Sequence, residues 1–185
     1  RGLLTSFYRY TRNMQFEAAN RNKRGMVLDL TKEEGKEVLG KQVKRADVFL
    51  HNFRPRAARK LGVDYATLSS FNPRLVYAAA SAWGPEGPDS GKPGFDVAAM
   101  ARTGLMYTFA GNQVTNPQEP PPIGFADVAG ATYLTIGILA ALQAREHLGR
   151  GQVVDTSIFG STVCMATFAV SYALAHGSDI VMDRS

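Results

Sequence analysis

The sequence predicts an α/β fold, with an open, mostly parallel sheet and flanking helices. Two short apolar runs, Ala46–Phe53 and Arg74–Ser81, have the length and composition of strands that are buried on both faces. A segment with helical spacing of apolar residues, Thr31–Arg45, precedes the first run, and two short helical segments lie between the runs. Strands that alternate with helices along a chain form parallel sheets, so this order indicates the α/β class.

The N-terminal part is expected to contain a loop, a strand and a helix. Arg1–Lys23 lacks periodicity and is interpreted as loop, whereas Arg24–Leu30 alternates apolar and polar residues as a strand does. Thr31–Arg45 is expected to be an exposed helix with a narrow apolar stripe, and Thr31 and Glu34 have the spacing of a capping box at its start. The predicted order is therefore strand, helix, strand from residue 24 onward.

The middle of the chain carries clear helix boundaries. Pro55–Leu61 is expected to be a short basic helix ended by Gly62, and Asp64–Phe71 a second helix capped by Asp64. The glycine- and proline-rich stretch Trp83–Gly94 must be loop. Structureless connections of about 12 residues are uncommon inside compact domains, so a functional role is expected for this loop.

The C-terminal half is expected to be largely helical. Asp96–Leu105 is predicted to be a helix, and Gly111–Pro122 is predicted to be irregular. Val153–Ser157 is a candidate strand, and Phe159–His176 is predicted to be one packed helix that ends at Gly177.

Asp127 stands out because it follows a short apolar run and opens a long apolar helix, so that it is expected where a strand gives way to a helix. One interpretation is an N-cap, which satisfies free backbone N–H groups and contributes about 1 kcal/mol. The other is a nucleophilic carboxylate, which needs backbone donors and room for a substrate. Small neighbours such as Gly124, Ala129 and Gly130 leave that room, although spacing alone favours the N-cap.

The composition of the chain limits the classes of binding partner that are expected. The 185 residues suffice for one domain with a sizeable core, and the net charge of +5 lies mostly within Arg1–Lys60. No nucleic-acid-binding motif accompanies this charge, so nucleic acid is not expected as a partner, and a small phosphorylated ligand suits the local basic clusters better. The longest apolar candidate, Phe159–Ala175, is interrupted by hydroxyl residues, which favours a buried helix over a membrane span.

Cysteine and histidine usage points away from metals. Cys164 is the only cysteine, which excludes a disulfide within the chain and a cysteine-based metal site, and its apolar neighbours indicate an inert core thiol. This usage fits a reducing compartment. His51, His147 and His176 lack ligand spacing, so structural roles are expected for them and no metal is expected.

A basic cluster follows the second predicted strand. Neither a dinucleotide fingerprint nor a P-loop is present in the sequence. Ligands of open parallel sheets bind at the carboxyl ends of strands, so this cluster is well placed for an anionic nucleotide, although a solvated basic helix face would have the same composition. Its members are Asn52, Phe53, Arg54, Arg56, Arg59 and Lys60.

Six segments, in this order, share a pattern with one enzyme family. They are Asn20–Leu30, Ala46–Pro55, Asn72–Gly84, Pro93–Leu105, Ala126–Leu142 and Gly149–Phe159. Together they resemble the class III CoA-transferases, the group of formyl-CoA transferase, carnitine CoA-transferase and α-methylacyl-CoA racemase. The resemblance implies a Rossmann-like large domain, of which residues 1–185 would be the N-terminal part. Family members are considerably longer, so the first strand, a glycine-rich active-site loop and a later small domain are expected to lie outside this chain.

The resemblance also implies the chemistry. Asp127 matches the aspartate that attacks an acyl-CoA thioester, and the reaction passes through an aspartyl anhydride and an aspartyl-CoA thioester. Lys60 stands where arginine is usual, which keeps the charge and loses the bidentate geometry. The implied CoA-binding residues are Leu28, Asn52, Phe53, Arg54 and Lys60.

A transferase is preferred over two alternatives. Racemases of this group carry a histidine in the Gly-His-Asp stretch, and here the stretch is Gly94-Phe95-Asp96, where phenylalanine cannot move a proton. A racemase or lyase on the same scaffold, and a catalytically silent CoA-binding fragment, remain the competing readings. The expected partners are an acyl-CoA and a carboxylic acid acceptor, with no tightly bound cofactor. An interlaced homodimer is expected for the full-length protein, in the cytoplasm or, in a eukaryote, in mitochondria or peroxisomes.

Overall fold

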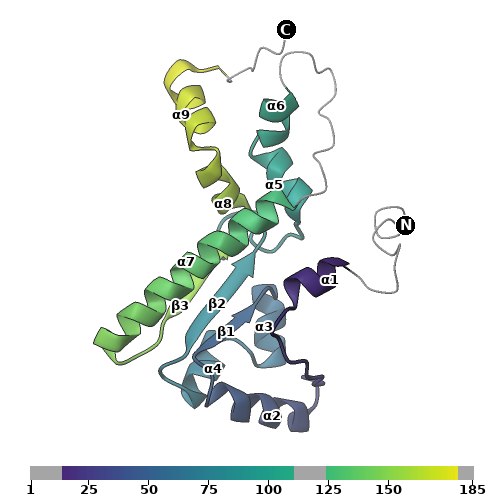
Figure 1. The fold of residues 1–185 in the computed structure, drawn as a ribbon, viewed down its shortest axis with the longest axis vertical. Helices are drawn as coiled ribbons and strands as arrows, with labels where there is room; N and C mark the ends of the chain where they lie inside the picture. Colours follow the sequence, from purple (N-terminus) through teal and green to yellow (C-terminus); the bar gives the residue numbers. More distant parts are fainter. Residues whose placement is uncertain (1–13, 111–123, 179–185) are drawn as a thin grey trace.

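The structure is a computed structural model that describes residues 14–110 and 124–178. It contains a parallel sheet of order β1-β2-β3, formed by Val48–His51, Val76–Ser81 and Val153–Ser157 (Figure 1). The register runs from Val48 opposite Val76 in the first pair and ends with Ser81 opposite Ser157 in the second. The predicted α/β class and parallel sheet are confirmed, and the carboxyl ends of all three strands lie at one edge.

Helices flank the sheet in two groups. α2, α3 and α4 lie around β1, α7 runs along β2 and β3, and α5, α6, α8 and α9 extend beyond the carboxyl edge (Figure 1). The helix bounds are α1 Met14–Ala19, α2 Glu33–Val43, α3 Pro55–Leu61, α4 Tyr65–Phe71, α5 Asp96–Arg102, α6 Leu105–Ala110, α7 Phe125–Leu148, α8 Ile158–Met165 and α9 Thr167–His176.

The first group encloses the main core. We refer to β1, β2 and α2–α4 as the strand–helix region. Local signals set its helix ends as predicted: Gly62 adopts φ 68° after α3, and the Asp64 carboxylate accepts the backbone N–H of Thr67 at 3.1 Å to cap α4. Its fully or almost fully buried core residues are Val43, Ala58, Val63, Leu68, Leu75 and Tyr77.

Two predictions for the N-terminal part are wrong. Residues 24–30 form no strand, and Met26 and Val27 are exposed, because an alternating pattern becomes a strand only where a neighbouring strand completes its hydrogen bonds. The capping box is also absent, since α2 has Lys32 as its N-cap without a side-chain bond. The Thr31 hydroxyl donates instead to Asp29 Oδ1, at 2.6 Å.

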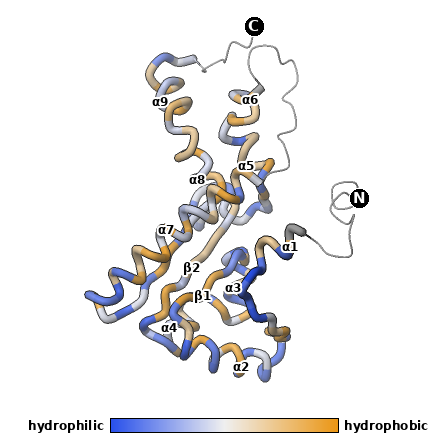
Figure 2. The backbone as a smooth tube through the Cα atoms, in the orientation of Figure 1, coloured by the Kyte–Doolittle hydropathy of each residue, from blue (hydrophilic) through white to orange (hydrophobic). Residues whose placement is uncertain are grey.

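α7 begins at Phe125, two residues before Asp127, and this changes the interpretation of Asp127. Gly124, with φ 64°, is the N-cap, so Asp127 is the third residue of the helix and the N-cap interpretation is wrong. The predicted irregular stretch 111–122 lies outside the described residues. So does the part before Gly124 of the strand that was expected to precede Asp127. The helix ends at Leu148 before left-handed Gly149, and Figure 2 shows its last turns as hydrophilic, as the sequence predicts.

By length and composition, α7 is also apolar enough to cross a membrane, with a mean hydropathy of 1.6 over its best 18-residue window. The longest apolar candidate expected from the sequence was a different segment, Phe159–Ala175. Yet α7 packs on β2, β3 and α8, and its Leu134 and Ala141 are buried there. A core helix covering a parallel sheet has the same composition, so the packing accounts for the apolar face that touches the sheet.

The helices beyond the carboxyl edge differ from their predictions. The helix predicted for Asp96–Leu105 ends at Arg102, and left-handed Gly104 (φ 75°) separates it from α6. The predicted single helix 159–176 is two helices, α8 and α9, bent by 73°. α9 ends at Gly177 as predicted, but it buries none of its residues, and Phe168 and Leu174 are 89% and 83% exposed. We refer to α5, α6, α8 and α9 as the helical end.

Candidate active site

A cavity of about 770 Å³ lies at the carboxyl edge of the sheet. Its walls come from the ends of β1 and β2, the first turns of α7 and the junction of β3 with α8. Three residues that the sequence singled out, Asp127, Asn52 and Phe53, line it together. The cavity therefore joins the candidate nucleophile to part of the candidate CoA-binding segment.

The other candidate residues are distributed differently. Arg54 lines an adjoining cavity of about 130 Å³, which shares Asn52 and Phe53 with the larger one. Leu28 is half-buried in the segment before α2, and Lys60 is exposed on α3. Neither Leu28 nor Lys60 lines either of these two cavities.

A second carboxylate, that of Asp96, accepts a hydrogen bond from the backbone N–H of Asp127. Its N–H donates to Oδ1 of Asp96, the first residue of α5, at 2.9 Å. Partial removal from solvent, followed by the nearby charge of Asp96, raises the pKa of the Asp127 carboxyl above its usual value. A raised pKa makes the ionised carboxylate more basic and a better nucleophile.

The loop before α5 closes tightly on the end of β2. A Cβ atom at Gly94 would lie 2.5 Å from Ala82 Cβ and 2.8 Å from Trp83 Nε1, so only glycine fits there. The Trp83 indole N–H donates to the Pro93 carbonyl at 3.2 Å. The predicted Trp83–Gly94 loop is confirmed, and Gly94 itself lines the large cavity.

Lys92 was missed by the sequence analysis. It lines the small cavity with Arg54, and its ammonium pairs at 2.5 Å with Asp89, which also pairs with Arg102. The available signal was its position in a glycine- and proline-rich loop that was already expected to be functional. Lys92 and Arg54 together give this cavity two cationic side chains.

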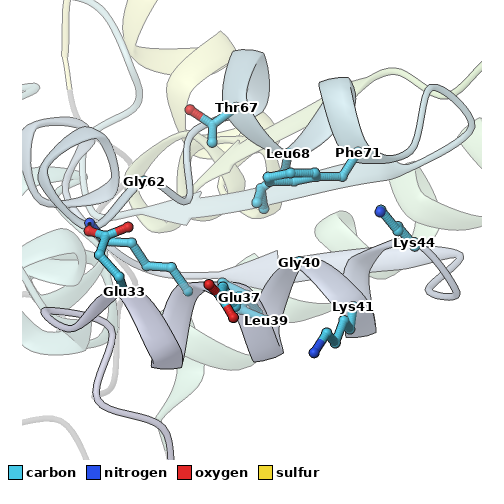
Figure 3. A pocket seen from close by; sticks show the side chains of 11 residues that line it. Glu33, Glu37, Leu39, Gly40, Lys41, Lys44, Gly62, Thr67, Leu68 and Phe71 are labelled. Carbon is cyan, nitrogen blue, oxygen red and sulfur yellow. Dashed lines mark hydrogen bonds and ion pairs between the residues drawn. The ribbon is translucent and has the colours of Figure 1, made fainter.

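A cavity of about 540 Å³ lies elsewhere, between α2 and α4. Figure 3 shows Leu68 and Phe71 of α4 facing Leu39 and Gly40 of α2 across it, with charged side chains of α2 along its rim. No candidate site residue lines it. It belongs to the interface of two helices in the strand–helix region.

The histidines and the cysteine bear on metal binding. Within residues 14–110 and 124–178, no three His, Cys, Asp or Glu side chains are placed to hold a metal ion. His147 and His176 lie in the last turns of α7 and α9. The expectation that Cys164 is a core thiol is wrong: the residue is exposed, and its Sγ lies 3.0 Å from Oη of Tyr133 on α7.

The fold and the site together define an α/β protein with a carboxylate in a ligand cavity at the carboxyl edge of a parallel sheet, which is the usual ligand position in such sheets. The chain belongs to CoA-transferase family III, whose family model matches residues 4–183.

Individual relatives agree with this family. An acyl-CoA transferase of Fusarium pseudograminearum is 37% identical over 156 residues, covering 82% of this chain and 33% of that protein. An acetyl-CoA:oxalate CoA-transferase of Acetobacter aceti is 33% identical over 162 residues, covering 85% of this chain and 40% of that protein. The chain thus spans between a third and two fifths of these relatives.

Solved structures give the same result. The crystal structure of a CAIB/BAIF family protein from Brucella suis has a TM-score of 0.84 and 32% identity, covering 90% of this chain and 43% of that one. A second structure, Rv3272 from M. tuberculosis, has a TM-score of 0.78 and 33% identity over 85% of this chain and 44% of that one. At these identities the likeness supports the family as well as the fold.

Proposed function

We propose that this chain supplies the nucleophile and much of the CoA-binding surface of a CoA-transferase that moves coenzyme A from an acyl-CoA to a carboxylic acid. The observation that carries the proposal is the single cavity shared by Asp127, Asn52 and Phe53. The relatives are named for transfer between different pairs, among them formyl-CoA with oxalate and succinyl-CoA with mesaconate. The donor and acceptor of this protein therefore stay open within that class.

The proposed reaction uses one carboxylate twice. An Asp127 oxygen attacks the thioester carbonyl and the C–S bond breaks. The CoA thiolate departs, and the acyl group stays on Asp127 as a mixed anhydride. The thiolate then attacks the Asp127 carbonyl and releases the original acid as its carboxylate, which leaves an aspartyl-CoA thioester. The acceptor carboxylate repeats these two steps in reverse, and the products are a new acyl-CoA and free Asp127. Each step exchanges one acyl bond for another, without water, redox chemistry or net proton transfer.

The surroundings of Asp127 support this role. The start of a long helix presents backbone N–H groups without helical partners, which favour developing negative charge. On the next turn Gly130 also lines the cavity, and without a side chain it takes no space from a ligand. Partial desolvation also raises the pKa of Asp127, which makes its ionised form a better nucleophile.

The cations suit the phosphates of CoA. Arg54 and Lys92 share the small cavity next to the acyl site, and Arg54 can bind phosphate oxygens in a bidentate manner. Asn52 and Phe53 line both cavities and are proposed to contact the nucleotide and the arm that leads to the thioester. Lys60 and Leu28 are proposed as more distant contacts, since they line neither cavity.

The alternatives differ in what they require. A racemase needs an acid and a base at the α-carbon, and exposed Phe95 supplies neither at the position where racemases have histidine. A silent CoA-binding fragment would bind thioesters without forming a covalent adduct. An interlaced homodimer and a cytoplasmic location remain part of the proposal.

The decisive experiment is intact-protein mass spectrometry of the full-length protein after incubation with a panel of acyl-CoAs and hydroxylamine. We expect a hydroxamate at Asp127, and the productive thioester would identify the donor. Asp127→Asn should form no adduct. Asp155→Asn is the matched control, because partial desolvation also raises the pKa of Asp155, but this residue lines neither cavity. CoA binding without any adduct would favour the silent binding module, and α-proton exchange in deuterated water would favour the racemase.

A further inference from the structure

His51 occupies an unusual place at the end of β1. Its side chain is only 7% exposed, and it lies among the rings of Phe49, Phe53 and Tyr77, at centroid distances of 5.0 to 5.7 Å. Nδ1 accepts the backbone N–H of Phe53 at 3.0 Å, and Nε2 lies 2.7 Å from Tyr77 Oη. Tyr77 Oη in turn lies 3.0 Å from the Val63 carbonyl oxygen.

These contacts fix the protons of the network. A carbonyl oxygen can only accept, so the Tyr77 hydroxyl must donate its single proton in the hydrogen bond to the Val63 carbonyl. Nε2 must then carry a proton and donate it to Tyr77 Oη. Nδ1 must be unprotonated, because a backbone N–H can only donate to it. Only the neutral imidazole with its proton on Nε2 satisfies all three bonds.

The network controls the backbone that enters the cavity. Asn52 and Phe53 directly follow His51, and both line the large cavity together with Asp127. The His51 ring stacks on the Phe53 ring at 22° and also receives the Phe53 N–H. One buried side chain therefore sets both the direction of the chain after β1 and the orientation of Phe53.

We propose that His51 is a positioning residue for the thioester ligand: its neutral imidazole holds the Asn52–Phe53 turn in the shape that binds CoA. The inference rests on the proposed function, because it concerns the same ligand. It adds His51, which lines the large cavity beside Asn52 and Phe53, as the residue that shapes their turn. His51 acts on CoA affinity through Phe53 and does not act on the reacting atoms.

Protonation of His51 would break the turn. An imidazolium has two donors, so Nδ1–H would face the Phe53 N–H and neither could accept. Burial lowers the pKa of His51 and so favours the neutral form. The network includes Tyr77 on β2, whose pKa is raised to about 12, first by burial and then by the charges of Asp64 before α4 and Asp155 on β3. Asp127 is the other titratable group that lines the same cavity as His51.

Two substitutions separate the two ends of the ring. In His51→Asn the amide oxygen can take the place of Nδ1 and accept the Phe53 N–H. In His51→Gln the amide reaches the place of Nε2 and Tyr77, and the Phe53 N–H loses its acceptor. Both variants lose the same aromatic ring, so loss of stacking affects them alike.

The test is calorimetric binding of CoA to the full-length protein and to both variants between pH 5 and 8, together with the rate of Asp127 acylation at saturating thioester. Near pH 8 we expect His51→Gln to bind CoA about five- to tenfold more weakly than His51→Asn, the usual effect of one hydrogen bond. At saturation the acylation rates of the two variants should agree. Wild-type affinity should fall relative to His51→Asn as the pH falls, because only the wild type has a residue at this position that can be protonated.

The outcomes are distinguishable. Equal CoA affinity in the two variants, or a parallel pH dependence in wild type and His51→Asn, would overturn the role of His51 and leave the proposed function standing. A wild-type protein that binds no CoA would overturn the proposed function, and with it the ligand assigned to this turn. A difference between the variants in acylation rate alone would also overturn the inference, since it would place His51 at the chemistry.

Discussion

The strand–helix region and α9 of the helical end bury apolar residues to very different degrees. The first encloses Val63, Leu68 and Leu75 at 0 to 1% exposure, whereas α9 buries none of its residues and leaves Phe168 and Leu174 almost fully exposed. The candidate site lies between them: Asn52 and Phe53 come from the first region, and Asp96, which anchors Asp127, comes from the second. The strand–helix region thus carries the proposed CoA-binding turn, and Asp96 of the helical end accepts the N–H of the proposed nucleophile.

The largest expected effect tests this contrast in burial. Leu68→Ala should lower the free energy of unfolding by about 3 kcal/mol, because it opens a cavity in a core residue that is 1% exposed. Leu174→Ala, the matched change at 83% exposure, should alter it by less than about 0.5 kcal/mol. Urea unfolding of the full-length protein measures both. Equal costs would show that the helical end is covered in solution, and the comparison would fail.

The second effect concerns the helix that joins the two regions. A Cβ at Gly137 would lie 2.6 Å from Val154 Cγ1, so Gly137→Ala should separate α7 from β3 and cost about 1–3 kcal/mol. Gly130→Ala is the control in the same helix. Its Cβ would meet Ile158 at an ordinary 3.5 Å, so the gain in helix propensity, about 1 kcal/mol, should survive. Thermal unfolding of the pair gives the sign of each change, and a stabilising Gly137→Ala would contradict the tight packing.

The third effect tests whether the helical end tunes the nucleophile. Asp96→Asn keeps an oxygen that can accept the Asp127 N–H and removes the charge that raises the pKa of Asp127. The acidic limb of the acylation rate should therefore move to lower pH. Asp96→Ala loses the hydrogen bond as well and should lower the acylation rate by about tenfold. If the pH profile of Asp96→Asn matches that of the wild type, the Asp96 charge does not act on Asp127.

The smallest effect is on stability and depends on pH. The folded protein raises the pKa of Asp127, so this group favours folding only when protonated, and its contribution is lost as the pH rises through its folded pKa. Asp127→Asn should therefore raise the melting temperature at neutral pH, by no more than about 2 °C because the carboxyl is exposed and screened. The gain should vanish below the usual aspartate pKa of 3.8. Scans at neutral pH and near pH 3 check this sign.

Local chemical signals made the strand–helix region predictable. Gly62 ends α3 and Asp64 caps α4 as the sequence indicates, because each acts on backbone groups within four residues. The strands β1 and β2 were likewise predicted from their apolar composition, but β1 is not buried on both faces as expected, since Leu50 is 60% exposed. The segment 24–30 was misread as a strand because alternation does not reveal whether a partner strand is present.

The helical end was less predictable. The bend between α8 and α9 follows no proline or glycine, and the Thr167 hydroxyl bonds back to the Cys164 carbonyl at that point. Apolar residues on several sides of α9 suggested a packed helix, yet they are exposed in the described structure. Hydrophobic composition indicates that a residue is buried somewhere, but it does not identify what covers it.

The sequence by itself determined the α/β class, the loop before α5, most helix ends and the position of Asp127 near the start of a long apolar helix, because these depend on interactions within a few residues. Only the tertiary structure decided that Asp127 shares a cavity with Asn52 and Phe53, that Asp96 holds its N–H, and that His51 must be neutral. Most of these contacts join residues 26 to 75 positions apart. Their proximity follows from strand register and from the packing of α7 on the sheet, which no local periodicity encodes.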